Sequence, residues 1–392
     1  MPASPLSPLL QVDLEYYEGH QALLAKGAYK SLGTHAKVRA FQKKNAISLP
    51  DFLNYFLIHR AESPDYVSYA ARLQQLDTAS SWLRGMLDTS STINWLRGSR
   101  GLQEQVGEAV SLCVASSMFG LTAADWDSIS EQRGRSAHPT FDFERTMVGI
   151  TAQDAVIQIE AKGSFVRDNT VEQNAVQKHA SNIATKKTKI TSKGVTYKHP
   201  ATAKYGMIAA IDQSHSAKCW ILDPPSDDVQ GNPRDLKIAA RLEYVALVVS
   251  LLAPHAKLPA ALRERASLWR EGISTEEVGP LEGFPYTSDN YVETFLARKK
   301  IWLRDHDVVG RLYLGEEKRI SFVGMRADLI RAAIKQDPEA ILAAHYEPAI
   351  EEFRLAGEPM RLDGKSSSSY QQVAMTLYTA SSGVVLGLPS KK

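Results

Sequence analysis

Residues 141–164 read FDFERTMVGITAQDAVIQIEAKGS, and this stretch predicts two neighbouring β-strands. From Ala155 to Phe165 the chain is dense in β-branched and apolar residues, which is typical of a short buried strand. An earlier strand is expected over about residues 140–150, and the loop near residues 151–154 allows the two strands to pair antiparallel. The sequence therefore predicts a β-hairpin at the centre of the fold.

Ionisable residues share one face of each predicted strand. Side chains alternate between the two faces of a strand, so Glu160 and Lys162 point to the same side. The opposite face of that strand is apolar, with Ile157, Ile159 and Ala161. On the earlier strand Asp142 and Glu144 share a face by the same rule. The hairpin is therefore expected to bring several carboxylates and an ammonium group together.

Such a cluster has the chemistry that phosphodiester cleavage requires. Carboxylate oxygens are the ligands that Mg²⁺ prefers, and the ion acidifies water and screens the charge of a phosphate. A neighbouring lysine stabilises negative charge that develops in the transition state. The pattern favours a metal-dependent nuclease site.

Asp142, followed 18 residues later by Glu160-Ala161-Lys162, resembles the PD-(D/E)xK nuclease superfamily. The resemblance covers about Gln103–Leu222 and is at the level of the superfamily. It implies an α/β fold with a mixed-sheet, restriction-endonuclease-like core. It also implies that Asp142, Glu160 and Lys162 are catalytic, and that the two carboxylates hold Mg²⁺, for which Mn²⁺ can substitute.

The sequence departs from the superfamily pattern at one point and leaves one alternative open. Pro139 stands three residues before Asp142 instead of next to it, which leaves Glu144 as a rival first ligand. The acidic-x-Lys tripeptide also occurs at three other places: Asp235–Lys237, Glu316–Lys318 and Asp363–Lys365. A surface strand with a solvated Glu and Lys is the structural alternative.

Two flanking helices offer auxiliary residues. A helix is predicted over Gln103–Phe119, and Glu108 on it resembles the extra carboxylate that many superfamily members take from a helix before the sheet. A second helix is predicted over Val171–Lys187, where Gln173 and Gln177 are candidates for positioning water or phosphate. A glutamate on a helix is usually solvated, which is the alternative for Glu108, and a polar helix face explains Gln173 and Gln177 equally well.

Positive charge is concentrated around the predicted site. The whole chain has a net charge of +2, but residues 133–220 hold 13 Lys/Arg and 7 Asp/Glu, and residues 178–204 hold seven lysines with no acidic residue. Such a run can follow a phosphate backbone, which makes DNA the expected partner. The candidate DNA-binding residues are Lys178, Lys186, Lys187, Lys189 and Lys193. A solvated helix end followed by a loop remains the alternative.

Composition indicates an ordinary soluble, cytoplasmic protein. The chain has 392 residues, of which 44% are hydrophobic, so there is enough length for more than one domain. Both cysteines lie in apolar runs without CxxC spacing, which argues against structural zinc. No secretory signal or membrane span is expected, because the N-terminus lacks a basic segment and the longest apolar run, Val245–Ala253, is too short.

The chain is predicted to have three regions: a helical region over residues 1–100, the nuclease core over residues 101–224, and a mostly helical region over residues 225–392. The first region includes a helix that starts at Ser63, with proline in its first turn. The last region is expected to contain one β-hairpin, from Val308–Leu314 and Arg319–Val323. Its helices are expected at Asp235–Pro254, Leu258–Gly272, Ser288–Asp305, Arg326–Gln336 and Pro338–Leu355.

The predicted function is that of a Mg²⁺-dependent DNA endonuclease of the restriction or phage-defence type, acting as a homodimer or with a partner subunit. Two alternatives stay open: a catalytically silent nucleic-acid-binding or interaction protein with a nuclease fold, and a nuclease of DNA repair or recombination. Phosphate-binding loops, serine-hydrolase elbows and HExxH zinc motifs are absent from the sequence.

Overall fold

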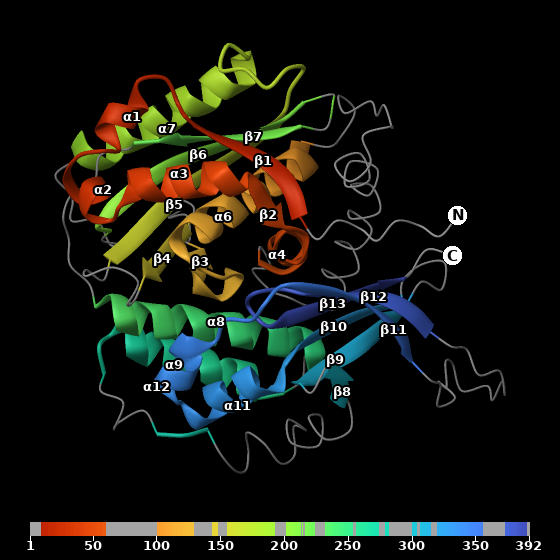
Figure 1. Ribbon diagram of the computed structural model, residues 1–392. Coiled ribbons are helices and arrows are strands. Elements are labelled where there is room, and N and C mark those ends of the chain that lie inside the picture. The colour runs from red at the N-terminus through yellow and green to blue at the C-terminus, as the bar shows by residue number, and fades with distance from the viewer. Residues whose placement is uncertain are drawn as a thin grey trace, which may run out of the picture.

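The computed structural model has two lobes, each built around its own β-sheet (Figure 1). It describes residues 9–59, 100–128, 143–147, 155–192, 201–212, 214, 216–223, 232–253, 256–273, 279–281, 300–303, 306–314, 320–355 and 373–389. The upper lobe in Figure 1 has a mixed seven-stranded sheet, and the lower lobe has a six-stranded antiparallel sheet. The predicted mixed α/β class is confirmed.

The predicted hairpin lies in the seven-stranded sheet, in which the strand order is β2-β1-β7-β6-β5-β4-β3. The strands are β1 (Leu9–Tyr16), β2 (Ala46–Ser48), β3 (Trp126–Ser128), β4 (Phe143–Met147), β5 (Ala155–Phe165), β6 (Ala203–Ile211) and β7 (Ala217–Leu222). β5 pairs antiparallel with β4, with Phe143 opposite Ile159, and pairs parallel with β6, with Glu160 opposite Gly206. The hairpin prediction is therefore confirmed.

The first strand of this sheet comes from the region that was predicted to be helical. In β1 Leu10, Val12 and Leu14 are buried and alternate with exposed Gln11 and Asp13, which is the period of a strand with one face in the core. β1 pairs parallel with β7, and β2 extends the sheet beyond β1. The expectation of an all-helical N-terminal region is therefore wrong for these two segments.

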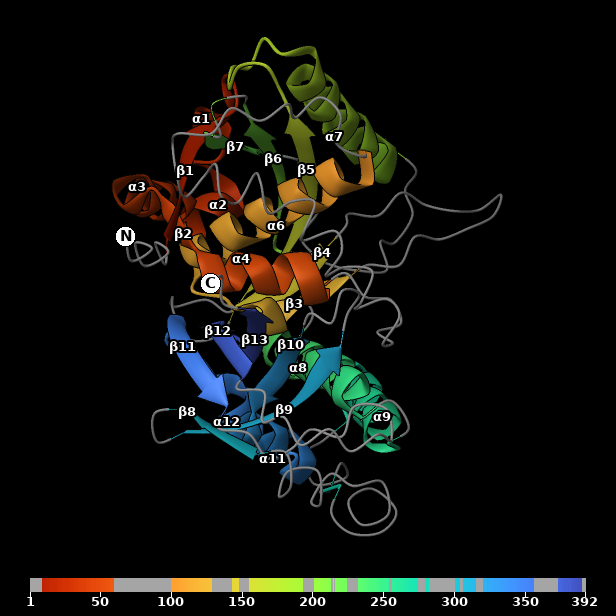
Figure 2. The same ribbon diagram turned by 90° about the vertical axis from the view of Figure 1, so that its right-hand side faces the viewer.

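Helices cover both faces of the seven-stranded sheet. On one face lies α6 (Arg100–Phe119), which crosses in front of β5, β6 and β7 in Figure 2. α7 (Asn174–Ser192) covers the other face and lies above the sheet in Figure 1. Both helices were predicted from periodicity, although α7 extends beyond Lys187 into the segment expected to be a lysine-rich loop. The sheet strands between the two helices are buried on both faces.

Short helices complete the upper lobe, and of these α3, α4 and η1 pack against α6. They are α1 (His20–Leu23), α2 (Gly27–Ser31), α3 (Thr34–Lys44), α4 (Leu49–Asn54) and η1 (Tyr55–His59). α4 starts at an N-cap, where Ser48 Oγ accepts a hydrogen bond from the Asp51 amide and Pro50 lies in the first turn. The helix predicted to start at Ser63 lies outside the described residues.

Two glycines bring α6 close to β5. A Cβ atom added to Gly107 on α6 would lie 2.0 Å from the Cα atom of Gly163 on β5, so the backbones meet without an intervening side chain. The apolar side chains of α6, such as Val106 and Val110, fill the core beside this contact together with Ile157 and Ile159. This contact fixes α6 behind the strand that carries Glu160 and Lys162.

The lower lobe contains more β-structure than the sequence predicted. Its strands lie in the order β11-β12-β13-β10-β9-β8. Their bounds are β8 (Lys300–Leu303), β9 (His306–Leu314), β10 (Ile320–Arg326), β11 (Ala349–Leu355), β12 (Val373–Thr379) and β13 (Val384–Pro389). Only the β9–β10 hairpin was predicted, and it is confirmed. The expectation that residues 225–392 contain only one β-hairpin is therefore wrong.

Two helix predictions fail in the lower lobe. α12 (Pro338–Ala343) ends well before Leu355, and β11 occupies the rest of the predicted helix. Pro348 supplies the reason, because it disfavours helical geometry at the residue before it, and β11 pairs with β12 instead. The end of the helix expected over Ser288–Asp305 is also wrong, since residues 300–303 form β8.

Three helix predictions in the lower lobe are confirmed. The helices are α8 (Pro233–Leu252), α9 (Leu258–Arg270) and α11 (Ala327–Lys335). Asn232 caps α8 by accepting a hydrogen bond from the Arg234 amide, and proline occupies the first turn. α8 lies directly beneath β3 and β4 in Figure 1, so it connects the lower lobe to the upper one.

A buried charge cluster ties the two lobes together. Asp125, in the short helix η3 (Ala123–Asp125), accepts hydrogen bonds from the Arg241 guanidinium at 2.6 and 3.2 Å. The Lys237 ammonium lies 3.6 Å from the same carboxylate. Arg241 also donates to the backbone carbonyls of Ile341, Leu342 and Ala344. One guanidinium on α8 thus holds η3 and the end of α12.

Candidate functional site

Glu160 and Lys162 lie on one face of β5, as their spacing predicted. The Lys162 Nζ is 2.6 Å from Glu160 Oε1, and the side chains of Glu160 and Lys162 are 1% and 28% exposed. Ile157, Ile159 and Ala161 point the other way and join the core beneath α6. The pair is therefore a buried carboxylate with an ammonium group that reaches solvent.

The neighbouring strand and α7 explain why Glu160 is so deeply buried. Gly206 on β6 is the register partner of Glu160 and has no side chain to fill the space above it. Ile183 of α7 takes that space, because a Cβ atom on Gly206 would lie 2.9 Å from its Cγ2 atom. α7 is held there by Val176, Ala180 and Ile183, which pack on β6 and β7. Ile183 therefore covers the sheet at the position beside Glu160.

The register of β4 determines which residues lie next to Glu160. Glu144 pairs with Gln158, and Phe143 pairs with Ile159. Because the strands are antiparallel, each step towards the N-terminus of β4 lies opposite a step towards Glu160 on β5. Asp142 is bonded to Phe143 but lies outside the described residues, as does the side chain of Glu144. The described backbone thus places the residue that follows Asp142 directly opposite the residue that precedes Glu160.

A hydroxyl and an imidazole extend the polar face of β5. Ser164 Oγ lies 2.7 Å from His179 Nε2, which joins β5 to α7. Burial lowers the pKa of His179, and the positive charge of Lys162 lowers it further. The imidazole is therefore neutral at pH 7. The spacing of residues in the sequence does not predict the Ser164–His179 contact, because the contact depends on how α7 packs against β5.

The auxiliary residues lie in different environments. Glu108 is buried on α6 and follows Gly107, which contacts β5 at Gly163. Gln177 is exposed on α7 and Gln173, just before that helix, is half-buried, whereas the residues that face the sheet are apolar. The structure thus buries Glu108 beside β5 and leaves Gln177 in solvent.

The structure describes little of the predicted DNA-binding run. Lys178 is exposed on α7. The backbone of Lys186, Lys187 and Lys189 continues α7, but their side chains lie outside the described part, as does the whole of Lys193. Lys186 and Lys187 therefore lie in a helix, as predicted, whereas Lys189 belongs to the same helix and not to the expected loop.

Within the described residues, no three His, Cys, Asp or Glu side chains form a group that could hold a metal ion. Asp142, the predicted partner of Glu160, is not among those residues. The donors that the residues offer are carboxylate oxygens, and these suit Mg²⁺ or Mn²⁺ rather than a metal that prefers sulfur ligands. In the same part of the chain, no helix has the length and apolar character needed to cross a membrane.

Comparison of the chain with protein-family models, with curated proteins and with solved structures finds no match.

Proposed function

We propose that this protein is a metal-dependent endonuclease that hydrolyses phosphodiester bonds of DNA, with Asp142, Glu160 and Lys162 in the PD-(D/E)xK roles. The observation that carries the proposal is the buried Glu160–Lys162 pair at 2.6 Å on β5. The register of β4 supports it, because Phe143, the covalent neighbour of Asp142, pairs with Ile159, the neighbour of Glu160.

The energetics of the Glu160–Lys162 pair favour a functional role. Moving a carboxylate out of water carries a desolvation penalty of several kcal/mol, and well-packed apolar residues often stabilise a fold as well as a buried ion pair does. Glu160 is 1% exposed in a strand whose other face is wholly apolar. An interior position that retains such a carboxylate is typical of a site where the charge is needed.

The two carboxylates and the lysine have different roles. Glu160 and Asp142 would hold Mg²⁺, which supplies a Lewis acid that acidifies water and screens the charge of the scissile phosphate. The Lys162 ammonium group contacts the Glu160 carboxylate and is partly exposed, so it can also contact the scissile phosphate. A fixed positive charge there stabilises the negative charge that develops as the bond breaks.

The arrangement of elements is compatible with this function. Along the chain α6 is followed by η3 and the edge strand β3, and then by the β4–β5 hairpin, α7 and β6. The parallel β5–β6 pair is joined through α7, as parallel strands require a crossover. This is the order expected of a restriction-endonuclease-like core, with the acidic-x-Lys motif on the second strand of the hairpin.

The first prediction concerns the metal. Full-length protein incubated with supercoiled plasmid is expected to nick or linearise it with Mg²⁺ or Mn²⁺, and chelation with EDTA should abolish cleavage and leave the circular-dichroism spectrum unchanged. Ca²⁺ should support DNA binding better than cleavage. Agarose-gel analysis of the products measures the effect. Cleavage that proceeds at the same rate in EDTA would contradict the proposal, and binding without cleavage would favour a catalytically silent nucleic-acid-binding protein.

A further inference from the structure

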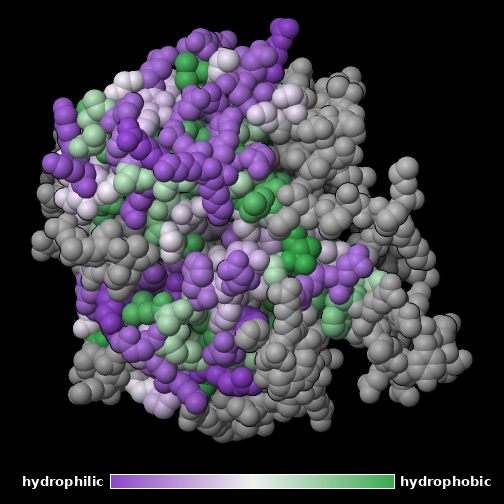
Figure 3. Space-filling model, in the orientation of Figure 1, coloured by the Kyte–Doolittle hydropathy of each residue, from purple (hydrophilic) through white to green (hydrophobic). Residues whose placement is uncertain are grey.

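A second basic surface lies on α2 and α3, away from the lysine run that follows β5. From Lys26 to Lys44 the chain has six Lys or Arg residues and no Asp or Glu. Five of them are exposed, namely Lys26, Lys30, Arg39, Lys43 and Lys44. We call these five residues the α2–α3 surface. Figure 3 shows hydrophilic side chains gathered over α1, α2 and α3.

Packing explains the sixth cation but not the other five. Lys37 is half-buried with its ammonium 5.5 Å from the centroid of the Phe119 ring, and burial lowers its pKa. None of the residues of the α2–α3 surface forms an ion pair with any residue that the structure describes. Their charges are therefore directed at solvent.

Helix stability does not account for the whole α2–α3 surface. Lys43 and Lys44 lie in the last turn of α3, where cations interact favourably with the helix dipole. Arg39 and Lys43, however, are four residues apart on the same helix, and like charges at that spacing destabilise a helix. The presence of Arg39 and Lys43 at this spacing, without acidic residues between Lys26 and Lys44, favours an external anionic partner.

An aromatic pair borders the α2–α3 surface. The Tyr16 and His35 rings stack with centroids 5.9 Å apart, and Tyr16 Oη lies 2.8 Å from His35 Nδ1. Burial raises the pKa of Tyr16 and the charge of Arg39 opposes this shift, so the guanidinium lies close to the phenol. Part-exposed rings beside cations are typical of surfaces that contact nucleic acids.

The sheet register relates the α2–α3 surface to the candidate site. Tyr16 on β1 is the register partner of Ile221 on β7. Ile221 in turn pairs with Met207 on β6, and Met207 pairs with Ala161 on β5. Three strand spacings correspond to about 14 Å, or roughly four base steps at 3.4 Å per step. The α2–α3 surface lies on the α6 side of the sheet, and Glu160 lies on the α7 side. A DNA backbone that contacts both must therefore cross the edge of the sheet at the ends of β1 and β7.

We propose that the α2–α3 surface binds the phosphate backbone of duplex DNA. The choice of DNA as the partner rests on the proposed function, whereas the inference of an anion-binding surface rests on the five exposed cations. An anionic membrane fits less well, because an interfacial helix inserts large apolar side chains, and the exposed uncharged residues of α3 are Ala36, Ala40 and Gln42.

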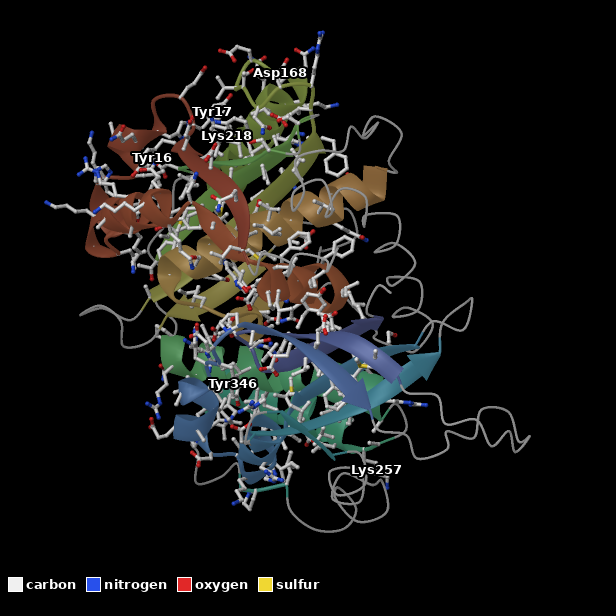
Figure 4. All side chains as sticks on the ribbon, turned by 45° about the vertical axis from the view of Figure 1, so that its right-hand side comes forward. Tyr16, Tyr17, Asp168, Lys218, Lys257 and Tyr346 are labelled. Carbon is white, nitrogen blue, oxygen red and sulfur yellow. The ribbon has the colours of Figure 1, made fainter. Side chains whose placement is uncertain are left out.

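The second prediction tests the α2–α3 surface by charge-matched double variants of the full chain. Arg39→Gln with Lys43→Gln removes two charges from the surface. Lys257→Gln with Lys335→Gln removes two exposed charges from the lower lobe, and Figure 4 shows Lys257 far from Tyr16. Anisotropy of a fluorescent duplex is measured in EDTA over about 50–200 mM salt, so that no cleavage is needed.

The surface variant is expected to bind about tenfold more weakly at low salt, and its log–log salt slope should fall by about 1.8, or about 0.9 for each lost phosphate contact. The control variant should match wild type. Equal slopes for all three proteins, equal weakening of both variants, or binding to anionic vesicles in place of duplex would each overturn the proposal. A reduced slope in a protein that never cleaves DNA would support the surface and refute only the nuclease activity.

Discussion

Replacing Lys162 with alanine is expected to lower the rate of DNA cleavage by about 10²–10³-fold, the loss seen when one electrostatic stabiliser is removed from an active site. Its Nζ lies 2.6 Å from the buried Glu160 carboxylate, so the variant leaves that carboxylate without this counter-charge and should unfold at a somewhat lower temperature than wild type. DNA affinity should change little, because one charge is a small part of the proposed phosphate-binding surface. Single-turnover cleavage and thermal unfolding measure the two effects.

A matched control is available on the same face of the sheet. Lys218 on β7 forms an ion pair with Glu15 at 2.7 Å, and the Glu15 side chain is 52% exposed. Lys218→Ala removes the same charge from β7, which is separated from β5 by β6, so cleavage should stay within about twofold of wild type. If Lys162→Ala cleaves as fast as Lys218→Ala, Lys162 has no catalytic role.

Asp125→Asn is expected to destabilise the fold by about 3–5 kcal/mol, because it leaves the Arg241 and Lys237 charges buried without a counter-charge. Asp125 is fully buried, and the Arg241 and Lys237 side chains are 3% and 7% exposed. The cluster joins η3 to α8 and α12, so its loss weakens the contact between the lobes. Urea unfolding followed by circular dichroism measures the change.

Asp127→Asn is the control, two residues away. Asp127 forms an ion pair with Arg270 at 2.5 Å, and the side chains of Asp127 and Arg270 are 37% and 32% exposed, so water screens this pair. Its loss should lower the free energy of unfolding by no more than about 1 kcal/mol. Similar losses in the two variants would show that the Asp125 cluster is not the joint between the lobes.

The pH dependence follows from the pKa of Asp125. Burial alone would raise this pKa, but the charges of Arg241 and Lys237 outweigh burial and hold it below its usual value. A carboxyl with a depressed pKa contributes stability above the unfolded-state value, about 3.9, and loses it as the pH falls through the folded-state pKa. The stability difference between wild type and Asp125→Asn should therefore be constant above about pH 4 and shrink below it.

The hairpin was predictable from sequence because its signal is local. β5 is an unbroken run of β-branched and apolar residues, and the strand period of two is enough to assign Glu160 and Lys162 to one face. The helical periods of α6 and α8 are equally local. Asp142 stays a prediction, since it lies outside the described residues.

Structure formed by distant pairing was not predictable in the same way. β1 has the alternating pattern of a strand, but its partner β7 lies far along the chain, and its place beside the core depends on that contact. β12 and β13 are short apolar segments that acquire their role by pairing with β11 and β10. The Ser164–His179 contact likewise depends on the tertiary position of α7. Local propensity does not determine such long-range contacts.

The most direct test is Mg²⁺-dependent nicking of supercoiled plasmid by three proteins in parallel: wild type, Glu160→Gln and Glu15→Gln. Both variants replace a carboxylate that is paired with a lysine on the same sheet, but only Glu160 belongs to the proposed site. Wild type and Glu15→Gln should nick the plasmid at similar rates, while Glu160→Gln, folded by circular dichroism, should show no nicking with Mg²⁺ or Mn²⁺. Nicking by Glu160→Gln at the wild-type rate would contradict the assignment of this protein as a PD-(D/E)xK-type nuclease.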